Sequence, residues 1–262
     1  MTESKYIAGA GGGGGGKGGG GGSSPTEADD SLQSKQFANA LDLISEGEIQ
    51  GLDDGNKSIF FNGTPLQAAD GSYNFTDYTI VTRTGTQGQS YIPGVFSNVE
   101  SETSVGVEVT NATPVVRQIT DSDVDRVRVT IQIPALQQIE DDGDIVGTSV
   151  SISIQVQYNG GGYSTVKTDT ISGKSSGSYQ RDYLLTLTGS FPVDIKVVRN
   201  TADNGTTKLA NTTNWQSFTS IIDAKLAYPN SALVGLRLGS SQFNSIPQRK
   251  YLIRGIKVAI PS

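Results

Sequence analysis

Short runs in which apolar and polar residues alternate dominate the chain from about residue 113 onward. The clearest run, 148–158, places Val and Ile at every second position, with Ser and Gln between them. A period of two buries one face of a strand and leaves the other polar, as in antiparallel sheets. Comparable runs occupy 114–119, 126–135, 163–171, 179–187 and 193–199. Strands at this even spacing predict an antiparallel β-sandwich over 113–226, and the single Trp, Trp215, is expected in its core or between domains.

The segments on either side of this region predict a second β unit. Residues 37–45 fit either a helix, with Phe37 and Ile44 on one face, or a strand; the turn-rich sequence that follows favours the strand. An apolar run ending at Asn62-Gly63 predicts a hairpin with a type I′ turn, because both residues tolerate positive φ. Further strands are predicted at 75–83, 105–110, 232–238 and 250–260.

The amino-terminal segment differs in composition from the rest of the chain. Residues 9–22 read GAGGGGGGKGGGGG. Such a tract loses much backbone entropy on ordering and has no side chain to bury, so we expect it to become rigid only where neighbouring subunits enclose it. A flexible linker is the alternative. The tract nearly matches a phosphate-binding loop at Gly11, Gly16 and Lys17, but Gly18 replaces the Ser or Thr, and the strand–loop–helix context is missing.

Composition narrows the possible chemistry. The chain of 262 residues has no His and no Cys, and its net charge is −6. The absence of both residue types excludes imidazole- or thiol-based catalysis and the usual zinc and iron–sulfur sites. An acidic chain is also poorly suited to binding nucleic acid phosphates. The acidic runs at 121–125 and 140–144 lack a complete calcium-loop pattern and are expected to be turns.

Two other functions fit parts of the sequence. Tyr158, Tyr163, Tyr179 and Tyr183 could form an exposed aromatic platform of a carbohydrate-binding, adhesive β-sandwich. Carboxylates such as Glu46 or Asp144 could serve a tail-associated wall hydrolase, provided that two of them face each other across a cleft.

Three segments resemble the lambda-type phage tail tip protein, or host specificity protein. They are 41–66 (LDLISEGEIQGLDDGNKSIFFNGTPL), 119–128 (ITDSDVDRVR) and 214–262, which contains YPNSALVG at 228–235 and ends in RGIKVAIPS. Their order and spacing agree with the hub region of that family. The resemblance covers about residues 25–262.

This resemblance implies a structural role. It predicts a mostly β chain: a mixed β hub domain with an inserted antiparallel β-sandwich and a Gly-rich N-terminal arm. The expected divisions are 1–24 for the arm, 25–112 and 227–262 for the two parts of the hub domain, and 113–226 for the inserted sandwich.

The resemblance also implies where the protein acts and what it contacts. The family forms the central hub at the distal tip of a long non-contractile tail, closes the tail tube and takes part in host attachment and genome delivery. The implied partners are two further copies in a homotrimer, the distal tail and tail tube proteins, and the C-terminus of the tape measure protein. The bacterial envelope is contacted indirectly, and no sequence-specific nucleic acid binding is implied. The chain would be made in the host cytoplasm and reside in the virion.

We predict no catalytic, metal or cofactor-binding residue, and no cofactor. Candidate interface residues lie in the arm and in three turns; ordinary turns within the fold are the alternative for each. They are Gly11, Gly16, Lys17 and Gly22 in the arm, Ser45, Glu46 and Gly47, Asn62 and Gly63, and Tyr228, Pro229 and Asn230.

Overall fold

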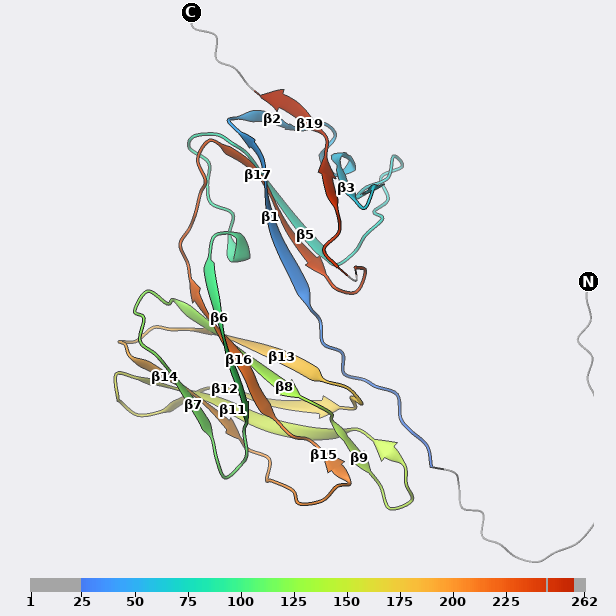
Figure 1. Cartoon of the computed structure of the whole chain (residues 1–262), viewed down its shortest axis with the longest axis vertical. Helices are drawn as coiled ribbons and strands as arrows, with labels where there is room; N and C mark the ends of the chain where they lie inside the picture. Colours follow the sequence, from blue (N-terminus) through green and yellow to red (C-terminus); the bar gives the residue numbers. More distant parts are fainter. Residues whose placement is uncertain (1–24, 244, 257–262) are drawn as a thin grey trace, which may run out of the picture.

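A computed structural model describes residues 25–243 and 245–256 of the chain. The described residues are mostly β, as predicted, and their helices are two short 3₁₀ turns, η1 (Gly55–Ser58) and η2 (Gly94–Phe96). No helix in these ranges is long and apolar enough to cross a membrane. The strands gather into two units, one above the other in Figure 1, and the chain passes from the upper unit into the lower one and back.

The lower unit is a sandwich of two four-stranded antiparallel sheets, in the orders β12-β11-β14-β7 and β13-β8-β16-β6. The strands are β6 (Val99–Glu108), β7 (Val115–Ile119), β8 (Arg126–Ile133), β11 (Thr148–Tyr158), β12 (Ser164–Gly173), β13 (Tyr179–Thr186), β14 (Val193–Arg199) and β16 (Asn214–Ile222). A small sheet at one end joins β9 (Gln137–Ile139), β10 (Ile145–Val146) and β15 (Leu209–Ala210).

Alternation of apolar residues builds the core of the sandwich. In β11, Val150, Ile152, Ile154 and Val156 are all at most 1% exposed, and β8 shows the same alternation of buried positions. Trp215 is fully buried in the same cluster, and its indole N–H donates to the carbonyl of Ser217 at 2.8 Å. The predicted one-face-buried strands and the sandwich-core position of Trp215 are confirmed.

The first strand of the sandwich was missed in part by the sequence pattern. The pattern predicts a strand only at 105–110 and assigns it to the hub part, whereas β6 begins at Val99 and pairs with β16. Most of its side chains are exposed, so the strand carries no clear alternation. The domain boundaries at 113 and 226 stay predictions.

The upper unit, here called the hub unit, brings together strands from both flanks of the sandwich. One sheet has the order β1-β17-β5, a second β18-β3-β4, and a third pairs β19 with β2. The strands are β1 (Phe37–Glu46), β2 (Ile49–Leu52), β3 (Ile59–Phe61), β4 (Thr64–Pro65), β5 (Tyr78–Thr84), β17 (Ser231–Gly239), β18 (Arg249–Tyr251) and β19 (Ile253–Ile256). Each of the three sheets therefore depends on contacts between residues far apart in sequence, except at the β3–β4 hairpin.

The core of the hub unit explains why residues 37–46 form a strand. β1 pairs antiparallel with β17 along its length, and its two faces serve different clusters. Ala40 and Ile44 pack on the cluster formed by β3 and β17, and Leu41 packs on the opposite cluster around Phe96. A strand supplies apolar residues to both faces, so the strand interpretation of 37–45 is confirmed over the helix.

The segment before β1 is fastened to the sandwich. The Lys174 side chain, 4% exposed, donates to Glu27 at 2.8 Å and to Asp30 at 2.9 Å. Hydrogen bonds from Ser176 and then from Lys174 lower the pKa of Asp30 to about 2. Leu32 packs on a second apolar cluster of the sandwich, and Ser34 accepts a hydrogen bond from the backbone N–H of Gln180. Residues 25–34 therefore run along the sandwich before the chain enters the hub unit (Figure 1).

Candidate assembly surface

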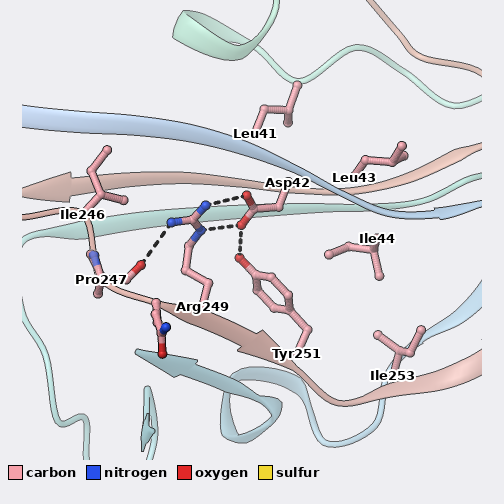
Figure 2. Close-up of a pocket in the computed structure, with 10 residues that line it drawn as sticks. Leu41, Asp42, Leu43, Ile44, Ile246, Pro247, Arg249, Tyr251 and Ile253 are labelled. Carbon is pink, nitrogen blue, oxygen red and sulfur yellow. Dashed lines mark hydrogen bonds and ion pairs between the residues drawn. The ribbon is translucent and has the colours of Figure 1, made fainter. Parts of the chain in front are cut away.

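One side of the hub unit is closed by side chains instead of backbone pairing. Arg249 on β18 donates to both carboxylate oxygens of Asp42 on β1, at 2.6 and 2.8 Å, and the Tyr251 hydroxyl donates to the same carboxylate at 2.5 Å (Figure 2). The hydrogen bond from Arg249 is the main cause of the lowered pKa of Asp42. Burial raises the pKa of the Tyr251 hydroxyl. The Asp42 carboxylate and the Arg249 guanidinium are therefore both charged, and their two charges cancel.

An open groove of about 760 Å³ runs over this ion pair. Its lining includes Leu41, Leu43, Ile246, Pro247 and Ile253, together with the ion-paired residues (Figure 2). Leu43 is 59% exposed, Ile246 54% and Ile253 38%. Large aliphatic side chains exposed together along a groove are typical of a surface that another polypeptide covers.

Two of the predicted interface turns meet at one end of the β1-β17-β5 sheet. The backbone N–H of Gly47 donates to the carbonyl of Asn230 at 2.7 Å. Gly47, Tyr228 and Asn230 all have positive φ, so both turns use conformations that favour Gly or Asn. The turn that contains Ser45 and Glu46 and the turn that contains Pro229 are thus one cluster, which sequence spacing alone did not reveal.

Gln89 fastens this cluster from a neighbouring loop. Its side-chain amide donates to the carbonyls of Ala227, Tyr228 and Ser231, at 2.6–3.0 Å, and its carbonyl accepts from the N–H of Gly85. No pattern in the sequence singled out Gln89. Its role comes from tertiary proximity, since the three carbonyls that it binds are more than 130 positions away.

Gly85 is expected to be intolerant of any side chain. Its φ is +88°, and an added Cβ would lie 2.7 Å from the carbonyl oxygen of Gly47 and 2.9 Å from the backbone N of Ala232. We predict that Gly85→Ala destabilises the hub unit by at least about 2 kcal/mol, because both the conformation and the backbone contacts are strained. Urea unfolding measures the loss in free energy of unfolding, and hydrogen exchange of the β17 amides locates it in the hub unit. Gly88→Ala is the matched control, since nothing lies within 4 Å of its Cβ position; equal effects of the two would contradict the prediction.

The third predicted turn lies apart from this cluster. Asn62 and Gly63 connect β3 to β4 with φ of 49° and 85°, as the type I′ prediction requires. The Asn62 side chain accepts from the N–H of Gln248 at 2.9 Å and so ties the hairpin to the segment before β18. The interface role of these turns stays a prediction, and Gly11, Gly16, Lys17 and Gly22 lie outside the described residues.

The structure shows where the tyrosines suggested for carbohydrate binding and the carboxylates suggested for hydrolysis lie. Tyr179 and Tyr183 are buried, at 7% and 6% exposure, and Tyr158 packs over Gly189, so of the four tyrosines only Tyr163 is exposed. Glu46 lies at the end of β1 next to β2, whereas Asp144 lies in the β9–β10 turn at the far end of the sandwich (Figure 1). These two carboxylates therefore do not face each other across a cleft.

The acidic segments act as turns within the described residues. Asp121 accepts from the backbone N–H of Asp123, and Asp125 from that of Asp223. Asp144 accepts from the backbone N–H of Thr26 and so helps to hold the segment before β1. Across residues 25–243 and 245–256, no group of three carboxylates is arranged to hold a metal ion.

Exposed strand edges and an apolar groove favour contacts with other polypeptides, which is the behaviour of a protein that assembles with other chains. A family model described as "Tip attachment protein J, FNIII-A domain" matches residues 99–224. The tip attachment protein J of Escherichia phage SECphi4 is 41% identical over 91% of this chain, and that of Escherichia phage SECphi27 is 33% identical over 84%. These matches cover 21% and 18% of the two relatives, so the chain spans about a fifth of their length.

The predicted resemblance to the lambda-type phage tail tip protein is confirmed for the N-terminal region of that protein. The region matched by the FNIII-A model starts at residue 99, where β6 begins, and ends just after β16. Among solved structures, the entire lipid-containing bacteriophage PM2 overlaps 80% of this chain and 75% of that chain at 12% identity. Its TM-score of 0.27 is too low to carry an argument.

Proposed function

We propose that this chain is a structural component of the tail tip of a long-tailed phage, where it forms the central hub that closes the distal end of the tail tube. The observation that carries the proposal is the similarity of 91% of the chain to a protein named tip attachment protein J. The hub unit of this chain is interrupted by a β-sandwich, and the region that matches the FNIII-A model lies in that sandwich. Host attachment and genome delivery would follow from this position at the end of the tube.

The proposed partners are two further copies of the chain, the distal tail and tail tube proteins, and the C-terminus of the tape measure protein. The free strand edges and the apolar groove of the hub unit support such contacts, because strand edges pair readily with other chains. The mechanism is mechanical: subunits pack, close the tube and separate when the genome leaves. The proposed function needs no catalytic group, cofactor or base-specific contact with DNA.

Two measurements test this proposal. Immunogold labelling of virions with an antibody against the sandwich should mark the distal end of each tail; label on heads or along the tail shaft would contradict the proposal. Native mass spectrometry of the purified full chain should give particles of three copies of the 27.5 kDa chain. Peptidoglycan clearing by the purified chain would instead support the hydrolase alternative.

A further inference from the structure

Two unpaired strand edges lie on the same side of the hub unit. β1 is the terminal strand of β1-β17-β5, and β18 is the terminal strand of β18-β3-β4. The side chains of Asp42 and Arg249 join these two strands across the groove, as Figure 2 shows. Among the described residues, no backbone hydrogen bond links either outer edge to another strand.

The hydrogen-bond patterns of the β1–β17 and β18–β3 pairs show which backbone groups of β1 and β18 point toward the groove. Ser240 N–H donates to the Gln36 carbonyl, so the even-numbered residues of β1 up to Asp42 pair with β17 and the odd-numbered ones point outward. Leu41 and Leu43 therefore offer backbone N–H and C=O groups to the groove. Likewise, Asn62 N–H donates to the Gln248 carbonyl, which leaves the backbone groups of Arg249 and Tyr251 facing away from β3.

The outward-facing backbone groups of β1 and β18 and the apolar groove beside them form a site that one additional strand can occupy. Free backbone groups along an edge provide hydrogen bonds, and exposed apolar side chains beside that edge select alternating apolar residues in the incoming strand. Leu43, Ile246 and Ile253 supply the apolar surface. Because the Asp42–Arg249 pair already neutralises itself, a neutral apolar strand suits the groove better than a charged one.

The sequence that follows β19 has this character. Residues 257–262 read KVAIPS, with the two large apolar residues Val258 and Ile260 on either side of the small Ala259. Pro261 lacks a backbone N–H and would end the pairing. Between Lys257 and Pro261 the segment therefore places two large apolar side chains at alternate positions and has no charged side chain.

β19 has already passed its own groove where residue 257 follows it. β19 passes the groove at Ile253 and ends at Ile256, whose side chain would lie 3.8 Å from a Cβ added at Gly47, just beyond the end of β1. A return would require a tight reversal, yet residues 257–260 contain no Gly, Asn, Asp or Pro. The sequence of the segment therefore favours a path to a neighbouring molecule over a return.

We infer that residues 257–262 of one copy add as a strand to the β1 edge of a second copy, over the Asp42–Arg249 pair. The inference rests on the proposed homo-oligomer and names the contact that would build it. Such head-to-tail donation of one segment to the next copy closes into a ring when the rotation between copies allows it.

The absence of Cys from the chain permits a direct test. One full-length variant carries Leu43→Cys and a second carries Val258→Cys or Ile260→Cys; the two are mixed and oxidised. We expect a disulfide-linked species of two chains on non-reducing gels, at least tenfold above a control mixture in which Leu184→Cys replaces Leu43→Cys. Leu184 is similarly exposed, at 54%, but lies on β13 of the sandwich.

Each outcome decides the inference. No cross-link above the control overturns it. A third variant carries Leu43→Cys and Val258→Cys in the same chain; a disulfide that forms only within that chain overturns the inference as well, because it would show that the segment returns to its own groove. Native mass spectrometry distinguishes a failure of the strand-addition inference from a failure of the proposed homo-oligomeric hub. Three-copy particles without the cross-link would leave the proposed hub standing and remove only this contact, whereas a chain that stays monomeric at all concentrations contradicts both.

Discussion

Trp215→Ala is expected to lower the free energy of unfolding of the sandwich by about 3–5 kcal/mol, the range for removing a large aromatic side chain from a packed core. Trp215 is fully buried and lies 6.2 Å from Phe218 between ring centroids. The substitution leaves a cavity and also removes the indole N–H that satisfies the carbonyl of Ser217. Circular dichroism during urea unfolding measures the change, since the variant has lost the only Trp fluorophore.

Leu184→Ala provides the control for this substitution. Leu184 lies on β13 in the same sandwich, yet its side chain is 54% exposed. We expect a change within about 0.5 kcal/mol, as for most surface substitutions. A cost below about 1 kcal/mol for Trp215→Ala would show that the sandwich core is not packed as described.

Asp42→Ala is expected to destabilise the hub unit by about 2–3 kcal/mol, since it leaves the guanidinium of Arg249 and the hydroxyl of Tyr251 without their shared acceptor. The Asp42 and Arg249 side chains are only 20% and 24% exposed, so water compensates poorly for the loss. Hydrogen exchange of β1 and β18 measures the effect within this unit. Asp53→Ala is the matched control, because the Asp53–Arg254 pair is 55% and 60% exposed and should contribute less than about 1 kcal/mol.

The contribution of Asp42 should also depend on pH. Its pKa is lowered in the folded chain, chiefly by the hydrogen bond from Arg249. The stabilisation is therefore fully present above the ordinary Asp pKa of about 3.9 and is lost as pH falls through the lower folded value. The difference between the wild-type chain and Asp42→Ala should shrink as pH falls below the ordinary Asp pKa. A difference that is constant from neutral to acidic pH would contradict the ion-pair account.

Alternating apolar residues were sufficient to predict most of the sandwich. The runs around 126–135, 148–158 and 193–199 all became strands with one buried face, because side-chain direction in a strand has a fixed period of two. The same rule failed for β6, whose side chains are exposed on both faces. Positive φ at Asn62 and Gly63 followed from local sterics and was also predictable.

The arrangement of the hub unit could not be predicted in this way. The Asp42–Arg249–Tyr251 group joins residues more than 200 positions apart, and the cluster of Gly47 with Asn230 depends on the same closure of the chain around the sandwich. Carboxylates, guanidinium groups and turn residues occur throughout the sequence without a period. Only the folded chain shows which of them meet.

The sequence thus determined most of the sandwich strands, the sandwich core and the resemblance to a family, because each depends on local periodicity or on the order of residues along the chain. The tertiary structure decided that, within residues 25–243 and 245–256, β1 and β18 leave their outer edges unpaired beside an apolar groove. The sequence pattern cannot show this, because pairing between strands that are far apart in sequence depends on long-range packing and not on local conformational preference.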